Sequence, residues 1–188
     1  NLLCIMLSSG IGAGIMIDGN LHKGFHGYAG EMGHMIISKD GEACRCGNHG
    51  CWELYSSEPS LLARLSRQLN MPKLTHEDVR ILIAEQDPIT VKLMEQYIID
   101  LSVGLNNIIN IYNPETLVLT SEILKMYPNA VDEIKSNLNS TVSQYRDLVI
   151  SELGNKSCAM GACALAIQRF LEVPKLILTM PEDSILLE

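Results

Sequence analysis

The densest group of chemically reactive side chains in this sequence is CRCGNHGC, residues 44–51, which holds three of the six cysteines. Cys44 and Cys46 flank a single residue, and Cys51 closes the loop after two glycines that permit a tight turn. Three thiolates can therefore converge on one point. Zinc prefers four ligands in a tetrahedron and commonly takes three cysteines and one histidine. The spacing favours a zinc site over reduced thiols without a metal.

Two histidines compete for the fourth ligand position. His49 lies inside the loop, but its neighbours Asn48 and Gly50 predict a turn that directs its side chain outward. His34 lies ten residues before Cys44, in EMGHMIIS, where a strand pattern would bring it back alongside the loop. We therefore predict that His34 completes the zinc site.

The composition is that of an ordinary globular domain and disfavours two classes of function. With 188 residues, of which 47% are apolar, the chain can form a full hydrophobic core. Its 14 basic and 22 acidic side chains give a formal charge of −8, which disfavours direct binding to nucleic-acid phosphates. No apolar run approaches the roughly 20 residues of a membrane helix, and the apolar start lacks the basic residues of a secretory signal. We expect a cytoplasmic protein, in which reduced thiols disfavour disulfides.

Two motifs together resemble a family signature. GEMGH followed by CRCGNHGCWE is similar to the pattern of the ROK family of bacterial sugar kinases and sugar-responsive repressors, ExGH followed by CxCGxxGCxE. The resemblance covers about residues 1–172. It implies a structural zinc held by one histidine and three cysteines, here His34, Cys44, Cys46 and Cys51. This ligand set agrees with the one that the spacing predicts.

The resemblance also implies a sugar site formed by Glu31, His34 and Glu53, with Gly10 of the upstream glycine-rich segment beside it. These residue types suit a sugar, because a carboxylate accepts hydrogen bonds from two neighbouring hydroxyls at once. An imidazole bound to zinc keeps its second ring nitrogen free to bond a hydroxyl. Either glutamate alone would be interpreted as a solvated surface acid, and only their positions in the motif favour a sugar contact.

Alternating strand and helix patterns predict the elements that position these residues. An apolar strand, a glycine-rich turn, a second strand and a tight turn at Asp18-Gly19-Asn20 open the chain. The later patterns predict helices over 56–70, 75–84, 87–112, 128–138 and 158–171, and strands over 116–120 and 147–151. No linker-like stretch divides the sequence, so residues 1–188 are predicted to form a single α/β domain.

The resemblance implies the C-terminal half of an actin-like, ribonuclease H-like ATPase fold with a zinc-binding loop. Family members carry upstream a DxGxT phosphate motif and an Asn-Asp pair whose aspartate is the catalytic base, and neither is in this chain. In family kinases the motif NPE and the hydrophobic strand after it are followed by a Gly-Gly pair. In this sequence Thr120, Ser121 and Glu122 occupy that place. A carboxylate at that place would repel polyphosphate, which argues against tight binding of ATP with Mg²⁺.

We therefore expect the sugar-sensing and dimerising part of a ROK-type transcriptional repressor, without enzymatic activity. The partners would be a small-molecule sugar, further copies in a homodimer or homotetramer, and DNA only through an absent N-terminal helix-turn-helix domain. The alternative is an ATP-dependent hexose or amino-sugar kinase of the same family, for which ATP and Mg²⁺ would be required. A zinc-stabilised interaction module without a small ligand is the third hypothesis.

Overall fold

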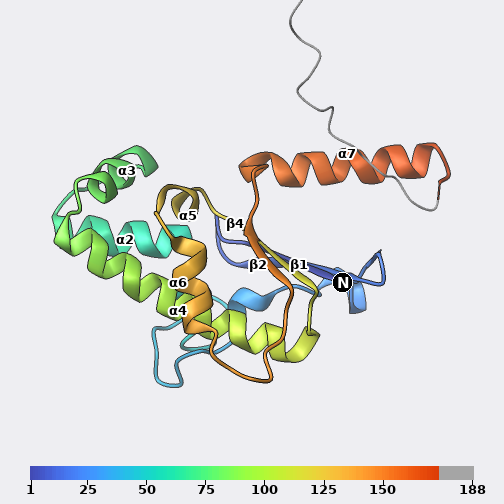
Figure 1. Ribbon diagram of the computed structural model, residues 1–188, viewed down its shortest axis with the longest axis horizontal. Coiled ribbons are helices and arrows are strands. Elements are labelled where there is room, and N and C mark those ends of the chain that lie inside the picture. Colours follow the sequence, from blue (N-terminus) through green and yellow to red (C-terminus); the bar gives the residue numbers. More distant parts are fainter. Residues whose placement is uncertain (174–188) are drawn as a thin grey trace, which may run out of the picture. The chain divides into compact units, whose positions relative to one another are not determined.

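The computed structural model describes residues 1–173, which form two compact units. The first unit, Asn1–Gly154, is built on a sheet covered by helices (Figure 1). The second begins at Asn155 and contains α7 (Ser157–Phe170). That residues 1–188 act as a single domain therefore stays a prediction. No helix within residues 1–173 has both the length and the apolar character needed to cross a membrane.

The sheet of the first unit has five strands in the order β3-β2-β1-β4-β5. Their bounds are Leu2–Met6 for β1, Gly12–Ile17 for β2, Asn20–Leu21 for β3, Thr116–Thr120 for β4 and Asp147–Ile150 for β5. β1, β2 and β3 pair antiparallel, whereas β4 runs parallel to both β1 and β5. The turn between β2 and β3 uses Asp18 and Gly19 at φ of 50° and 76°, the backbone that a two-residue hairpin requires.

Helices follow the predicted pattern closely. Their bounds are Glu53–Ser56 for α1, Glu58–Leu69 for α2, His76–Ala84 for α3, Pro88–Tyr112 for α4, Glu122–Met126 for α5 and Ala130–Asn137 for α6. Short 3₁₀ turns, η1 to η3, cover Phe25–Gly27, Met32–His34 and Gly154–Lys156. A capping box of Thr75 and Asp78 opens α3, and the carboxylate of Asp87 accepts from the backbone N–H of Thr90 at the start of α4. The short helices α1 and α5 are not in the sequence prediction.

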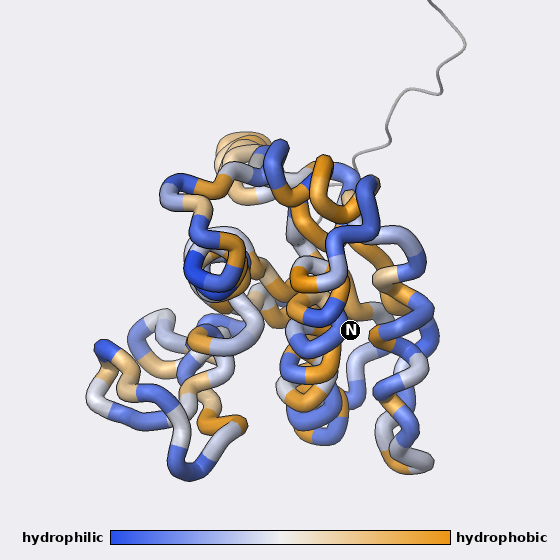
Figure 2. Tube along the Cα trace, turned by 90° about the vertical axis from the view of Figure 1, so that its left-hand side faces the viewer, coloured by the Kyte–Doolittle hydropathy of each residue, from blue (hydrophilic) through white to orange (hydrophobic). Residues whose placement is uncertain are grey.

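The hydrophobic core lies between the sheet and α4. α4 is the longest helix among the described residues; it runs alongside α2 and also packs against α1, α3 and α6 (Figure 1). Its buried side chains recur on one face, and hydrophobic and hydrophilic residues alternate along the helices (Figure 2). Leu3, Ile5, Leu117 and Leu119 of the central strands are buried beneath this layer. This rigid core carries the loops that hold the predicted site.

Candidate metal centre and adjoining pocket

Close backbone packing positions His34. Gly30 has a φ of +99°, and a Cβ atom there would lie 2.0 Å from the carbonyl oxygen of Ala13, so only glycine fits. The N–H of Ala13 donates to the carbonyl of Gly30 at 2.8 Å, and the N–H of Gly33 donates to the carbonyl of Ile11 at 3.1 Å. These bonds hold η2 against the start of β2. His34, the last residue of η2, is fixed by this contact.

The segment after His34 returns alongside the cysteine loop. Ile36 forms an antiparallel bridge with Cys51, and the N–H of Trp52 donates to the carbonyl of Met35 at 2.8 Å. This pairing of segments distant in sequence places the imidazole of His34 next to the cysteines. The return alongside the loop agrees with the prediction for EMGHMIIS, but the predicted strand does not form, because Met32–His34 take the 3₁₀ turn η2 and Ile36 makes only an isolated bridge.

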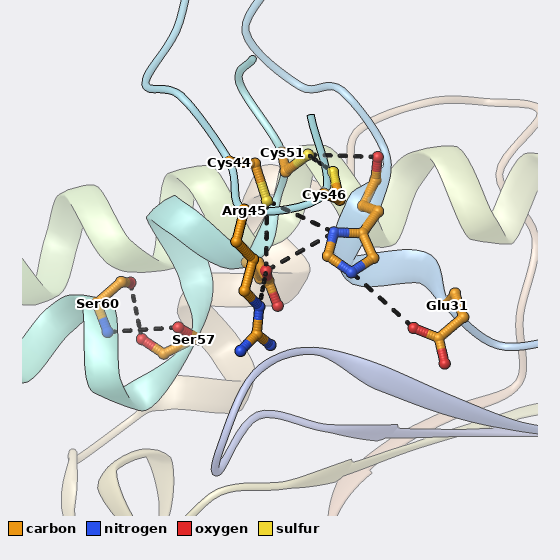
Figure 3. Close-up of polar contacts among 9 residues, drawn as sticks. Glu31, Cys44, Arg45, Cys46, Cys51, Ser57 and Ser60 are labelled. Atoms are coloured by element: carbon orange, nitrogen blue, oxygen red, sulfur yellow. Dashed lines mark hydrogen bonds and ion pairs between the residues drawn. The ribbon is translucent and has the colours of Figure 1, made fainter. Parts of the chain in front are cut away.

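Four side chains converge at this point (Figure 3). The Nδ1 atom of His34 lies 3.7 Å from Sγ of Cys44, and Sγ of Cys46 lies 3.6 Å from Sγ of Cys51. All four ligand atoms lie within 4.8 Å of one another. Zinc with bonds of about 2.0–2.3 Å in a tetrahedron separates its ligand atoms by about 3.5–3.8 Å, so the donor set fits zinc. His49 is exposed and is not part of this group.

The protonation of the thiols is uneven. Burial raises the pKa of Cys51 to about 12, and the neighbouring Cys46 and Cys44 add to this rise. A hydrogen bond from the backbone of Asn48 instead lowers the pKa of Cys46. A buried thiol with such a pKa ionises at neutral pH only beside a cation, because burial penalises the thiolate. Three sulfurs and one imidazole nitrogen, all from the protein, form a closed set that is typical of structural zinc.

Trp52 anchors the loop to the core. Its side chain is fully buried, and its indole N–H donates to the carbonyl of Asp100 in α4 at 3.2 Å. Gly104, one turn further along α4, leaves room for the ring, because a Cβ atom there would lie 2.0 Å from indole carbon Cε2. Cys51 and Glu53, the neighbours of Trp52, are therefore held by the longest helix of the first unit.

The four residues of the predicted sugar site lie around the cysteine cluster. Oε1 of Glu53 is 3.7 Å from Nδ1 of His34 and accepts a hydrogen bond of 3.5 Å from the thiol of Cys44. Oε2 of Glu31 lies 4.0 Å from Nε2 of His34. A Cβ atom on Gly10 would lie 3.0 Å from Oε2 of Glu53. The structure thus brings Gly10, Glu31, His34 and Glu53 to one side of the molecule.

A cavity of about 370 Å³ adjoins the cluster, within the size range of small-ligand sites. Gly10 and Glu53 are among its lining residues, together with Ser9 and Ser57. Glu31 and His34 lie beside this cavity rather than in its lining. Glu53 is only 11% exposed, whereas Glu31 is 66% exposed, so the two glutamates of the motif have different surroundings.

The sequence did not lead us to predict the arginines that line this cavity. Arg45 of the cysteine loop and Arg64 and Arg67 of α2 line it, and Nε of Arg45 lies 3.9 Å from Oε1 of Glu53. The signal was present in the spacing, because Ser60, Arg64 and Arg67 stand at helical intervals and share one face of α2. The spacing in the sequence does not show where Glu53 lies in the folded protein, so it does not predict that this face of α2 borders the same cavity.

A second missed residue is Glu58, whose side chain is 3% exposed. Its carboxylate accepts from the hydroxyl of Ser121 at 2.6 Å and from the N–H of Ile123 at 3.1 Å, and it lies 3.1 Å from Nε2 of His76. The backbone N–H of Glu58 donates to the carbonyl of Leu7 at 2.8 Å. Glu58 therefore joins the start of α2 to the end of β1, to α3 and to the loop between β4 and α5. A buried carboxylate is tolerated because each of these donors stabilises its charge.

Comparison with solved structures gives the class of the fold. A ROK family glucokinase from Streptomyces griseus in complex with glucose and AMPPNP matches with a TM-score of 0.78 at 24% identity, over 89% of this chain and 60% of that chain. A ROK family transcriptional regulator, a homologue of the E. coli MLC protein, matches with a TM-score of 0.70 at 26% identity, over 79% of this chain and 41% of that chain. The predicted α/β fold, that of actin-like (ribonuclease H-like) ATPases, is confirmed.

The family follows from the sequence. Residues 1–169 match the ROK family model, and the chain belongs to the ROK family. The xylose repressor of Bacillus spizizenii is 36% identical over 180 residues, which are 94% of this chain and 46% of the repressor. A glucokinase of Streptomyces coelicolor is 26% identical over 190 residues, covering 88% of this chain and 59% of the enzyme. The chain thus spans about half the length of the curated relatives it matches.

Proposed function

We propose that this chain is the sugar-sensing and dimerising part of a ROK-type transcriptional repressor in the cytoplasm. The observation that carries the proposal is the cavity beside the cysteine cluster, in which Glu53 presents a nearly buried carboxylate next to Gly10. The similarity to the xylose repressor, at 36% identity, supports the repressor branch of the family.

The chemistry of the pocket suits a polyhydroxylated ligand. A carboxylate accepts from two neighbouring hydroxyls, and the charge makes each hydrogen bond stronger than one between neutral groups. Glu53 would provide these acceptors inside the cavity, and Glu31 and His34 would contact the part of the sugar that projects beside it. Gly10 would let the ring approach the backbone, since a side chain there would meet the carboxylate of Glu53.

The cysteine cluster would hold structural zinc through His34, Cys44, Cys46 and Cys51. When bound, the metal supplies a cross-link between η2 and the cysteine loop rather than reactive chemistry, since the protein fills all four ligand positions. The protein's own part is to orient the imidazole: Nδ1 faces the sulfurs and Nε2 faces Glu31, where a sugar hydroxyl would lie.

The loop between β4 and α5 supports a sensor over a kinase. Thr120, Ser121 and Glu122 stand where family kinases carry glycines. In this structure the carboxylate of Glu58 also bonds the hydroxyl of Ser121 and the N–H of Ile123. Two carboxylates, Glu58 and Glu122, therefore border this loop, and both would oppose the phosphates of a nucleotide.

Regulation would follow from a difference in affinity. A sugar shifts a repressor between two arrangements only if it binds one of them more tightly. The DNA contacts would belong to a part of the parent protein outside residues 1–188, because this chain has a charge of −8. A homodimer or homotetramer would present two such parts to the symmetric halves of an operator.

The second candidate is an ATP-dependent sugar kinase. It is favoured by the match to the glucokinase of S. coelicolor at 26% identity over 88% of this chain. In that case this half would bind the sugar, and a base from outside residues 1–188 would deprotonate the hydroxyl that attacks ATP.

The experiment uses the full-length parent protein and a panel of pentoses, hexoses and amino sugars. Isothermal titration identifies sugars that bind, and the wild type is compared with Glu53→Gln and with Glu77→Gln, an exposed acid on α3 that serves as the control. We expect Glu53→Gln to weaken binding about 10- to 100-fold, the effect of one charge-assisted hydrogen bond.

The same protein is then assayed for sugar-dependent ATP consumption and for sugar-dependent release from DNA upstream of its own gene. Release from DNA without ATP turnover supports the repressor. Robust sugar-dependent ATP consumption would overturn the repressor proposal in favour of the kinase. If Glu53→Gln binds every positive sugar as tightly as the wild type does, the assignment of Glu53 is wrong.

A further inference from the structure

Cys46 differs from the other two cysteines of the cluster in its exposure to solvent. Cys44 and Cys51 are buried, whereas Cys46 lies in an exposed turn that covers residues 45–49. Gly47, the next residue, has a φ of +98°, and a Cβ atom there would meet nothing within 4 Å. A small oxidant in solution therefore reaches the sulfur of Cys46 before it reaches the two buried sulfurs.

The sulfur of Cys51 lies beside this exposed thiol. The two Sγ atoms are 3.6 Å apart, and Figure 3 shows the two side chains next to each other. A disulfide has an S–S length of about 2.05 Å, so the sulfurs must approach by about 1.5 Å, which the rotation of one side chain can supply. The pair is therefore placed to form a disulfide with little movement of the backbone.

Of the two sulfurs, that of Cys51 is held in place. Cys51 forms a bridge with Ile36, and the next residue, Trp52, is fully buried and bonded to α4. The preceding residue is also packed closely, since a Cβ atom on Gly50 would lie 1.7 Å from the carbonyl oxygen of Ser38. The exposed turn can bring Cys46 to this fixed sulfur without a change in the core.

The third cysteine faces other groups. The sulfur of Cys44 lies 3.5 Å from Oε1 of Glu53 and 3.7 Å from Nδ1 of His34. These contacts hold Cys44 on the side of the pocket. Cys51 is therefore the partner that the geometry favours for an oxidised Cys46.

We propose that Cys46 is a site of oxidation by peroxides, and that Cys46 and Cys51 form a reversible disulfide that releases the zinc and weakens sugar binding. The proposal rests on the proposed function, because it requires zinc in the cluster and a sugar in the adjoining pocket. Such a disulfide is transient in a reducing compartment, as a redox sensor requires.

The oxidation proceeds in two steps. The thiolate of Cys46 attacks one oxygen of hydrogen peroxide, so that an S–O bond forms, the O–O bond breaks and hydroxide leaves. The thiolate of Cys51 then attacks the resulting sulfenic sulfur, so that the S–S bond forms, the S–O bond breaks and a second hydroxide leaves. The two thiolates lose two electrons, and the peroxide gains them.

The disulfide would remove half of the metal ligands. His34 and Cys44 remain from the group of four, and structural zinc requires four protein ligands. His34 would then lose the bond that orients its ring, with Nε2 4.0 Å from Oε2 of Glu31. Formation of the disulfide should therefore weaken the sugar contacts of His34 as well as release the metal.

The test treats the zinc-loaded, full-length parent protein with hydrogen peroxide and follows the release of metal with a zinc-sensitive dye. Free thiols are then alkylated and the protein is cut with trypsin, which cleaves after lysine and arginine. Residues 46–64 form one such peptide, and Cys46 and Cys51 are its only cysteines. Cys44 falls in the peptide of residues 40–45, so a disulfide from Cys44 would join two peptides.

We expect peroxide to release about one equivalent of zinc per chain. The peptide of residues 46–64 should escape alkylation and be about 2 Da lighter than its reduced form, the mass of the two hydrogens lost. Isothermal titration should show the affinity for sugar falling about tenfold or more in the oxidised protein. A thiol reductant with added zinc should restore the metal, the reduced peptide and the affinity.

Two variants separate this site from general oxidation. Cys163→Ser removes an exposed cysteine outside the cluster and should release zinc as the wild type does. Cys46→His replaces the oxidisable ligand with another zinc ligand, so it should bind zinc and retain it in peroxide. The measurements on the wild type decide the question even if Cys46→His does not fold.

The proposal is wrong if zinc stays bound while the exposed Cys163 is oxidised. It is also wrong if the disulfide involves Cys44, or if the product is a sulfinic or sulfonic acid that thiol reductants do not reverse. Equal sugar affinity of the reduced and oxidised protein would contradict the regulation and leave the sugar-sensing function standing. If the reduced protein holds no zinc or binds no sugar of the panel, the proposed function fails together with this inference.

Discussion

The two ring nitrogens of His34 lie next to different groups. Nδ1 lies 3.7 Å from the sulfur of Cys44, and Nε2 lies 4.0 Å from a carboxylate oxygen of Glu31. A metal on Nδ1 would fix the proton on Nε2, which makes Nε2 a donor toward the sugar side. One imidazole can thus join the metal cluster to the ligand pocket. The same residue would transmit loss of the metal to the pocket.

At the residue scale we predict one zinc ion per chain. Elemental analysis after dialysis should find about one equivalent in the wild type, since four protein ligands form one closed site. Cys46→Ser should lose the metal, because a hydroxyl is a poor substitute for a thiolate. Removal of zinc by a chelator should lower the thermal midpoint, as binding of metal to the folded state stabilises it.

The control is Cys163→Ser, which changes a cysteine outside the group of four and should retain zinc. One equivalent of zinc in a variant that lacks Cys44, Cys46 and Cys51 together would show that the metal lies elsewhere.

At the scale of elements, α4 supports both the cysteine loop and α2. It bonds the indole of Trp52 through the carbonyl of Asp100, and its Asp100 carboxylate pairs with Arg64 of α2. Burial raises the pKa of the Asp100 carboxyl, and Arg64 partly offsets this effect. The cysteine loop and the arginine face of α2 therefore keep a fixed spacing because both rest on the same turn of α4.

Gly104→Ala should disrupt this attachment. The added Cβ atom would lie 2.0 Å from the fully buried ring of Trp52, so the ring or α4 must shift. Overpacking of this kind costs about 1–3 kcal/mol, and we expect a loss of that size in the free energy of unfolding measured with urea. Zinc should also dissociate faster, because Trp52 follows Cys51 directly.

The matched control is Gly14→Ala in β2, where the added atom would make an ordinary contact of 3.9 Å with Cβ of Cys4. It should change stability far less than Gly104→Ala. Equal stability of Gly104→Ala and the wild type would mean that Trp52 is not held as tightly as the structure indicates.

At the scale of the whole molecule, the net charge bears on whether this chain binds DNA as well as a small ligand. The formal charge of −8 opposes the phosphates of DNA, which must be met by clustered basic groups. The three arginines that line the pocket are too few to bind a duplex. Sensing and DNA binding would therefore reside in different parts of the parent protein.

Residues 1–188 alone should not bind DNA. In a gel-shift assay at about 0.1 M salt, micromolar protein should leave duplex DNA of mixed sequence unshifted. Non-specific binding to DNA depends on basic groups that contact several phosphates and release their counterions. The full-length parent, tested on DNA upstream of its own gene, is the positive control. A shift produced by residues 1–188, with or without sugar, would contradict this division of roles.

The sequence by itself determined most of the regular elements and which four side chains gather in the cluster. Strands are short apolar runs bounded by turn residues, and the long helices carry a periodic apolar face with caps such as Thr75 and Asp87, so local patterns suffice. The sequence did not predict α1 and α5, because helices of four and five residues are too short to show a periodic pattern. The helix predicted over 128–138 begins only at Ala130, because Asn129 takes the left-handed backbone at its N-cap.

Tertiary structure alone decided the surroundings of the charged residues. Nothing in the spacing of Glu58 marks it as buried, and an isolated glutamate is normally solvated; its burial comes from donors more than sixty residues away, such as Ser121 and Ile123. The arginines of the pocket are likewise ordinary helix and loop residues in the sequence. They share a cavity with Glu53 because α1 and α2 pack on α4 and Trp52 attaches the cysteine loop to the same helix. Long-range packing of this kind leaves no local pattern in a sequence.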